Sequence, residues 1–341
     1  MSRSLDFKHG VVELAHGSGG RASALLTKEL FLPALTNTEL AKGDDGAVFE
    51  VEAGRLVVST DSHVISPLFF PGGDIGSLSV FGSVNDVAVM GAKPRHLTAG
   101  FILEEGYPLT DLKRIAESMG RAAKACAVSV IAADTKVVKR GEADGVFITT
   151  TCIGVMPEGL NLDASNIQSG DQVLISGSMG EHGAAVLASR EDLGFHAAIE
   201  SDSQPVHGLV KALLDSGAKI HFMRDPTRGG VATVLNEVVN MADKGIKIDE
   251  QALPVREPVR AVSELLGLDP LYFACEGRVV VICAAADAEQ ALKVMQAHPA
   301  GLGSVNIGEV VDGLPHLTVR NSWGGERIVN MLAGDQLPRI C

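Results

Sequence analysis

The feature that most constrains the fold is the alternation of strand-like and helix-like segments along most of the chain. Strand patterns at residues 96–104 and 144–156 flank a helix pattern at residues 109–126, with apolar residues recurring at the spacing of each structure. Such alternation is typical of layered proteins in which helices cover a sheet. We therefore predict an α/β (α+β) fold.

The length of the chain predicts two domains. At 341 residues it exceeds the usual size of a single core. The stretch MPEGLNLDASNIQSGD, with Pro157 and two glycines, has the composition of a connection between domains. We predict an N-terminal domain at 1–157 and a C-terminal domain at 158–325. A flexible tail is expected at 326–341, where the apolar pattern thins.

Local signals place individual elements. Asp74 is predicted to cap a helix that ends before Gly91 and Pro94. Residues 48–62 are predicted to form a hairpin with its turn at 52–54.

The composition excludes several classes of partner. A net charge of −13 disfavours nucleic acid, which requires a basic face. The sequence has no run of about 18 uncharged apolar residues that could span a membrane. Its first residues lack the apolar segment of a signal peptide. We therefore expect a cytoplasmic protein that binds neither nucleic acid nor membrane.

The cysteines do not form a disulfide framework, because their number is odd and no CxxC pair occurs. They are Cys126, Cys152, Cys275, Cys283 and Cys341. The first four have apolar neighbours and are expected to be small core residues. Cys341 is the last residue, and a chain end is rarely packed. It is either incidental or a thiol on a movable arm.

Common nucleotide-binding motifs are missing from the sequence. No Gly-Lys dipeptide occurs, which excludes a Walker A P-loop. The segment GSGGRA formally fits GxGxxA but lacks a βαβ frame, so a Rossmann site is not predicted.

Carboxylates in loops and at strand ends favour a metal-bound nucleotide instead. They stand in GDDG, STDS and AADTK, and Asn85-Asp86 interrupts the apolar pattern of the helix after Asp74. Oxygen ligands from several elements suit Mg²⁺ with a triphosphate, although GDDG is also a common turn. The predicted nucleotide-binding side chains are Asp44, Asp45, Asp61, Asn85, Asp86, Asp134 and Arg228, and the predicted metal ligands among them are Asp45, Asp61, Asp86 and Asp134.

Two Gly-rich turns add capacity to bind anions. HGSGG at 16–20 and DPTRGG at 225–230 each precede a helix pattern, where backbone N–H groups attract phosphate. Arg228 could add a charged fork. Each turn is equally compatible with a plain helix N-cap. Lys136 stands two residues from Asp134, and an isolated lysine is usually a surface residue.

The order of these motifs resembles the PurM-like superfamily of ATP-binding enzymes, which includes aminoimidazole ribonucleotide synthetase, selenophosphate synthetase and thiamine-monophosphate kinase. The motifs are HGSGG, GDDG, STDS, NDVAVMGAKP, DTKVV and DPTRGGV. FFPGGDIG, GFILEEG, FACEGRVV and a terminal PRIC narrow the resemblance to the hydrogenase maturation factor family HypE. The likeness runs from His16 to Cys341. AADTK departs from it, because the family more often has a glycine before the aspartate.

The resemblance implies a two-domain PurM-like fold, with an N-terminal mixed sheet that forms the dimer and the ATP site and a C-terminal α/β sandwich domain. It implies ATP and Mg²⁺ as cofactors and a homodimer. It also implies an ATP-dependent carbamoyl dehydratase. In that family a partner, HypF, places a carbamoyl group on the last cysteine, and dehydration leaves a thiocyanate. The cyano group then passes to iron on the HypC–HypD complex for [NiFe] hydrogenase.

The same resemblance implies three catalytic residues. Cys341 would carry the carbamoyl group, and Lys136 and Glu276 match family positions that flank it. An extended arm from Gly334 to Cys341 would reach roughly 25–30 Å, enough to swing from solvent into a cleft.

Two other functions stay open from the residues alone. One is another PurM-like small-molecule kinase or synthetase in which Cys341 is incidental. A selenophosphate synthetase would want a reactive thiol near the N-terminal Gly-rich turn, and no cysteine precedes Cys126. The other is a non-catalytic partner protein with an interaction tail. Prenylation would require a cysteine four residues from the end, whereas Cys341 is last.

Overall fold

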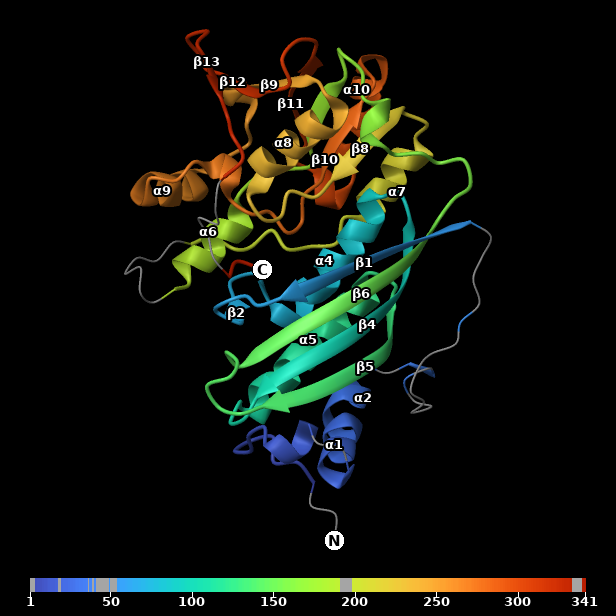
Figure 1. Ribbon diagram of the computed structural model, residues 1–341, viewed down its shortest axis with the longest axis vertical. Helices are drawn as coiled ribbons and strands as arrows, with labels where there is room; N and C mark the ends of the chain where they lie inside the picture. Colours follow the sequence, from blue (N-terminus) through green and yellow to red (C-terminus); the bar gives the residue numbers. More distant parts are fainter. Residues whose placement is uncertain are drawn as a thin grey trace.

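The computed structural model describes residues 4–17, 20–35, 37–38, 40, 49, 54–190, 198–332 and 339–341. Within these ranges the chain forms a four-stranded sheet and a seven-stranded sheet, each covered by helices, one following the other along the long axis of the molecule (Figure 1). The four-stranded sheet belongs to the N-terminal half of the chain and the seven-stranded sheet to the C-terminal half. This arrangement confirms the predicted fold class.

The N-terminal sheet is mixed, as the resemblance implied. Its strand order is β1 (Arg55–His63), β6 (Val146–Met156), β4 (Lys93–Glu104) and β5 (Ser129–Val138). β6 pairs antiparallel with both β1 and β4, whereas β4 and β5 are parallel. The second arm of the expected hairpin is β1. Most of its first arm lies outside the described residues.

Two helices cover one face of this sheet. They are α4 (Ile75–Val89) and α5 (Leu109–Ala125), which also pack against each other. Alternate residues of β4, such as Phe101 and Leu103, are fully buried beneath them. Ile102 points the opposite way and is exposed. The sheet therefore has an inner face toward the helices and an outer face that no other described element covers.

The start of α4 confirms the predicted cap. The Asp74 carboxylate accepts hydrogen bonds from the backbone N–H groups of Gly76 and Ser77, and the Ser77 hydroxyl lies 3.2 Å from the Asp74 backbone nitrogen. The helix ends at Val89, just before Gly91. Asn85 and Asp86, which interrupt the apolar pattern, lie within this helix, in agreement with the predicted stop at Gly91 and Pro94. Neither residue type breaks a helix when tertiary contacts hold it.

Short elements complete the N-terminal half. They are α1 (Gly20–Leu26), a π-helical turn at Thr27–Phe31, α2 (Leu32–Leu35), β2 (Phe69–Phe70) and β3 (Gly73–Asp74). α2 packs on α5.

The C-terminal sheet has the order β13-β12-β9-β11-β7-β10-β8. Its strands are β7 (Gln172–Ile175), β8 (Ile220–Arg224), β9 (Gly245–Asp249), β10 (Val280–Cys283), β11 (Val305–Val311), β12 (Leu317–Arg320) and β13 (Glu326–Ile328). Its helices are α6 (Glu181–Ala188), α7 (His207–Asp215), α8 (Gly230–Ala242), α9 (Glu257–Leu266) and α10 (Ala288–Ala297).

Buried side chains fill both faces of this sheet. Val173 and Ile175 of β7 belong to the cluster under α8, whereas Leu174 between them belongs to the cluster under α7 and α10. The sheet therefore lies between helical layers, which is the predicted α/β sandwich. All four internal cysteines are buried, as their apolar neighbours predicted.

The C-terminal sheet extends further along the chain than the sequence predicted. β13 pairs with β12, and Val329 after it is buried. Both lie within 326–341, the range expected to be a flexible tail. The strand was missed because a three-residue edge strand carries almost no periodic signal.

The cap of α4 gives a first prediction. Asp74→Ala should lower the free energy of unfolding by about 1 kcal/mol, because two N–H groups lose their acceptor. Urea denaturation followed by circular dichroism measures this. Asp215→Ala is the control, since it removes only an exposed ion pair with Lys211 and should cost less than about 0.5 kcal/mol. Equal stability of the two variants would contradict the capping role.

Candidate active site

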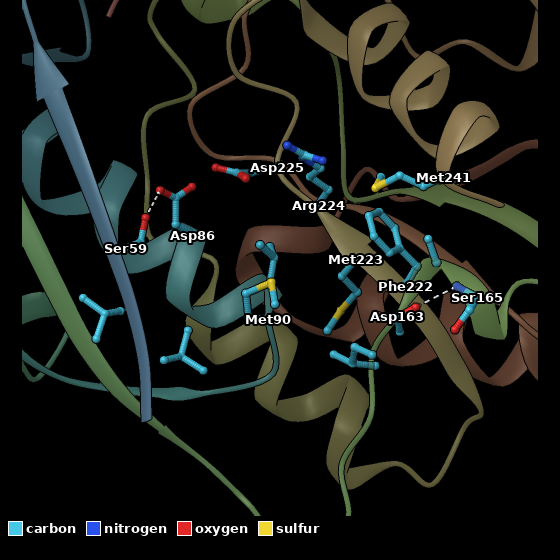
Figure 2. A pocket seen from close by; sticks show the side chains of 15 residues that line it. Ser59, Asp86, Met90, Asp163, Ser165, Phe222, Met223, Arg224, Asp225 and Met241 are labelled. Carbon is cyan, nitrogen blue, oxygen red and sulfur yellow. Dashed lines mark hydrogen bonds between the residues drawn. The ribbon is translucent and has the colours of Figure 1, made fainter. Parts of the chain in front are cut away.

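Three carboxylates from both halves of the chain meet between the two sheets. Asp61 lies on β1, Asp86 on α4, and Asp225 directly follows β8. Asp86 accepts a hydrogen bond of 2.6 Å from the Ser59 hydroxyl, and Asp225 points toward Asp86 (Figure 2). The sequence folds this way locally because alternate residues of β1 face α4, which puts Ser59 and Asp61 on the inner face.

Burial gives these carboxylates unusual acidities. Desolvation and the neighbouring Asp86 raise the pKa of Asp225 to about 8. Desolvation also raises the pKa of Asp86, and the charge of Asp61 adds to that effect. Buried carboxylates that repel one another retain protons unless a cation is bound nearby.

A cavity of about 720 Å³ opens beside this cluster. Asp86 and Asp225 lie at one end, and Met90, Phe222 and Met241 line a more apolar part (Figure 2). Small-molecule sites commonly combine an apolar lining with a few polar groups that fix orientation. A charged group could bind at the carboxylate end and a flat ring among the apolar side chains.

Glu276 is buried near the same carboxylates. It is only 3% exposed, and its Oε1 has no hydrogen-bond partner among the described residues. Desolvation, followed by the charges of Asp225 and Asp61, raises its pKa well above the usual value. A carboxyl group with a raised pKa is a better proton acceptor than an ordinary carboxylate.

Asp202 anchors Glu276 to helix α6. Its Oδ1 accepts hydrogen bonds of 3.2 Å from the backbone N–H groups of both Glu276 and His182. Burial raises the pKa of Asp202 to about 6, although the Arg278 guanidinium 3.3 Å away opposes the shift.

The last three residues are connected to Glu276 through His182 and Asp202. His182 Nε2 is 2.7 Å from the backbone oxygen of Ile340, and the Val64 N–H donates to the backbone oxygen of Cys341. Ile340 is buried and Cys341 is half-buried. We expected a loose end here, but residues 339–341 pack against the protein. The apolar Ile340 side chain explains this, because burying it is favourable.

The structure does not bring Asp134 and Lys136 to this cluster. They form an exposed ion pair of 2.7 Å, with 72% and 64% of their side chains accessible. Asp134 stands opposite Gly100 and Lys136 opposite Ile102 on the parallel neighbour β4, so both belong to the outer face of the sheet. The prediction that Asp134 joins Asp61 and Asp86 therefore fails within a single chain.

Asn85 has a different role from the predicted one. Its amide donates to the backbone oxygens of Gln204 and Glu276, and its Oδ1 accepts from the Val206 N–H. These bonds connect α4 to the C-terminal half. They use both the amide nitrogen and the oxygen of Asn85 for contacts within the protein. Arg228 is exposed, and its charge acts on buried His63, so it lies at the edge of the cluster. Asp44 and Asp45 lie outside the described residues.

The carboxylates fit a divalent cation only in part. Within the described ranges, no group of three His, Cys, Asp or Glu side chains is placed to hold an ion by itself. Mg²⁺, however, is commonly held by one or two carboxylates together with substrate phosphates. Asp86 and Asp225 have raised pKa values because burial and neighbouring carboxylates disfavour their charge, and a cation bound beside them would favour the ionised forms. These residues are the described part of a possible Mg²⁺–nucleotide site.

Sequence reasoning missed Asp225, Asp202 and His182. Asp225 had a signal, because it begins the DPTRGG turn that was singled out for its glycines and arginine. Asp202 and His182 had none, since their importance comes from contacts with residues more than 70 positions away.

Comparison with known proteins shows the protein family to which the chain belongs. A family model described as AIR synthase related protein, N-terminal domain, matches residues 43–156, and the corresponding C-terminal domain matches residues 168–319. The chain is 55% identical over 342 residues to carbamoyl dehydratase HypE of Azotobacter vinelandii, covering all of both chains.

Solved structures of HypE proteins are also similar to this chain. A crystal structure of the hydrogenase maturation protein HypE in complex with ATP superposes with a TM-score of 0.92 at 44% identity, covering 96% of this chain and 99% of that one. A HypE–HypF complex matches with a TM-score of 0.79 at 46% identity, covering 90% and 99%. The chain belongs to the HypE family of carbamoyl dehydratases.

Among the described residues, no helix has the length and apolar character needed to cross a membrane. The cytoplasmic location expected from the sequence stays a prediction.

The acidity of Asp225 gives a second prediction. Its pKa rises from 3.8 to about 8 on folding, so the unfolded chain releases this proton first as the pH rises. The group therefore lowers stability progressively between about pH 4 and pH 8. Asp225→Asn removes this effect and should be more stable than the wild type at pH 8, by about 1–3 kcal/mol, but equal near pH 4.

Thermal unfolding with a chelator present, at both pH values, measures the difference. Asp215→Asn, at an exposed position, is the control and should show none. A stability difference that is the same at both pH values would count against the buried, protonated carboxyl.

Proposed function

We propose that this protein dehydrates a carbamoyl group carried on the thiol of Cys341 to a thiocyanate, using ATP, during maturation of [NiFe] hydrogenase. The observation that carries the proposal is that the chain end is bound by His182, which shares its anchor Asp202 with buried Glu276. An enzyme whose substrate is attached to its own last residue requires such an arrangement. The family and the ATP complex of a relative support the same reaction.

The reaction breaks one C–O bond and two N–H bonds. The carbamoyl oxygen attacks the γ-phosphorus of ATP and ADP leaves, which converts a poor leaving group into phosphate. The nitrogen then loses both protons while the C–O bond breaks and the C≡N bond forms. Thiocyanate, ADP and phosphate result.

Glu276 is the proposed base for this elimination. Its buried carboxyl has an Oε1 available among the described residues, and its raised pKa suits proton uptake. The neighbouring carboxyl Asp202 fixes its backbone and limits its movement.

The carboxylates Asp61, Asp86 and Asp225 are proposed to face the phosphates of ATP, with Asp44 and Asp45 as further members of the site. Mg²⁺, when bound there, would neutralise charge on the phosphates and on these side chains. The adjoining cavity is proposed to hold the rest of the nucleotide, and Arg228 to contact its phosphates.

The outer face of the N-terminal sheet is proposed to form a homodimer. Leu56, Val58 and Ile102 are exposed on it, and large apolar side chains gathered on one face favour association. Asp134 and Lys136 share this face. Pairing would place them at the dimer interface, where they could complete a nucleotide or substrate site that a single chain leaves open.

HypF as carbamoyl donor and the HypC–HypD complex as cyanide acceptor are the proposed partners. The HypE–HypF complex of a relative supports the first.

The function gives a third prediction. Incubation with HypF, carbamoyl phosphate and ATP should add one carbamoyl group to the chain and then remove one water, as read by intact-protein mass spectrometry. Cys341→Ala should accept no carbamoyl group, whereas Cys126→Ala, which alters a buried thiol, should react as the wild type does. Modification of Cys341→Ala at another position would exclude Cys341 as the carrier.

The same assay discriminates between the alternatives. A different PurM-like kinase would consume ATP without changing its own mass, and a non-catalytic partner would do neither.

Glu276 gives a fourth prediction. Glu276→Gln keeps the size and the backbone contact to Asp202 but removes the base, so thiocyanate formation should fall by about 10²–10⁴. Binding of ATP, measured by calorimetry, should stay within about threefold of the wild-type affinity. Glu264→Gln, at an exposed position on α9, is the control. Loss of ATP binding in Glu276→Gln would show that the residue serves the nucleotide site.

A further inference from the structure

Residues 339–341 contact a set of residues that we call the tail seat. It consists of Val64, Ser66, Asp144, His182 and Arg190. Backbone bonds give the first contacts. The Val64 and Ser66 N–H groups donate to the backbone oxygens of Cys341 and Arg339, each at 3.2 Å. These two bonds join alternate residues of the segment after β1 to alternate residues of the chain end, which fixes the position of the last three residues.

Side chains add selectivity to the tail seat. Arg339 forms an ion pair with Asp144 and donates from Nε to the Val64 backbone oxygen at 2.9 Å. Arg190 donates to the backbone oxygens of both Ser66 and Arg339 at 3.1 Å. Ile340 is 3% exposed within the apolar core. The tail seat therefore distinguishes a cationic side chain followed by an apolar one.

His182 is the most buried member of the tail seat. Its Nε2 lies 2.7 Å from the Ile340 backbone oxygen and its Nδ1 lies 2.8 Å from the Ser201 hydroxyl. A carbonyl oxygen only accepts, so Nε2 must carry the proton. The Ser203 N–H donates to Ser201 Oγ, which leaves the Ser201 hydroxyl to donate to Nδ1. The ring is therefore held as one neutral tautomer, in agreement with a pKa that burial lowers to about 4.

His182 is also coupled to Glu276 through a shared anchor. The backbone N–H groups of both residues donate to Asp202 Oδ1. The group that holds the peptide before Cys341 and the proposed base are thus fixed to one carboxylate, so their separation is set by the protein rather than by the tail.

We propose that His182 is a positioning residue that holds the Ile340–Cys341 peptide so that the group on the thiol faces Glu276, and that the tail seat recognises the Arg-Ile-Cys end. The catalytic part of this inference rests on the proposed role of Cys341. The recognition part rests only on the contacts of the tail seat.

Alkylation of Cys341 tests recognition without any activity. Full-length protein is treated with iodoacetamide, and labelling of each cysteine is followed by peptide mass spectrometry. His182→Ala should label Cys341 about tenfold faster than the wild type, because the tail leaves the tail seat more often. His182→Gln should stay within about threefold, since its side-chain amide can donate in place of Nε2.

The buried thiols Cys126, Cys152, Cys275 and Cys283 report folding in the same experiment and should remain unlabelled. If His182→Ala does not fold, the labelling rate of Asp144→Asn tests the tail seat instead. This substitution removes the ion pair with Arg339 and should speed Cys341 labelling by about threefold. Asp249→Asn breaks a comparable surface pair with Arg320 and should not. Wild-type labelling rates in a folded His182→Ala, or equal rates in the two Asp variants, would overturn the tail seat.

Single-turnover dehydration of the carbamoylated protein tests positioning. His182→Ala should slow thiocyanate formation by about 10–100-fold with unchanged ATP affinity, and His182→Gln should recover most of the rate. A wild-type dehydration rate in His182→Ala would overturn the positioning role. If the wild type itself forms no thiocyanate, the proposed function fails, while the alkylation result still decides whether the tail seat exists.

Discussion

The structure depends on holding several carboxylates in a buried space between the two sheets. Only part of this charge is compensated: Arg278 approaches Asp202 and Glu181. Asp225 and Glu276 instead have raised pKa values, because burial desolvates both carboxyl groups and neighbouring carboxylates repel their charge. Burying such groups costs free energy, and proteins tolerate that cost chiefly where function needs it. The site is therefore set up for a positively charged partner and for proton transfer.

Both halves of the chain are needed to build this site. Asp61 and Asp86 come from the N-terminal sheet and α4. In the C-terminal half, Asp225 follows β8 and Glu276 lies in the segment before β10. Asn85 connects them, because its amide binds backbone groups at Gln204, Val206 and Glu276. A residue that was expected to contact the nucleotide instead ties α4, which carries Asp86, to the segment that carries Glu276.

What the sequence could predict was local or periodic. The cap at Asp74, the helix after it and the buried cysteines follow from spacing and neighbours. The face on which Asp134 and Lys136 lie could not be predicted, because one residue of register in β5 exchanges the two faces. The contact between His182 and Ile340 spans 158 positions and leaves no local pattern. Such contacts depend on long-range packing. A single sequence therefore identifies candidate residues but does not predict which of them come into contact.

The strength of the tail seat is compatible with the proposed role of Cys341 as a carrier. Besides the ion pair of Arg339 with Asp144, two backbone and three side-chain hydrogen bonds contact residues 339–341, each worth about 1 kcal/mol net. Burial of Ile340 adds about 2 kcal/mol. Fixing three residues costs roughly 1–2 kcal/mol of backbone entropy each, and their side chains cost more. The favourable contributions of the contacts and the entropic cost of ordering the tail therefore differ by only a few kcal/mol. In the proposed function HypF has to reach the Cys341 thiol, so the tail must spend part of its time outside the tail seat, and much stronger binding would prevent that. The contacts with His182 and Val64 are therefore sufficient to define a position, while their modest sum leaves exchange possible.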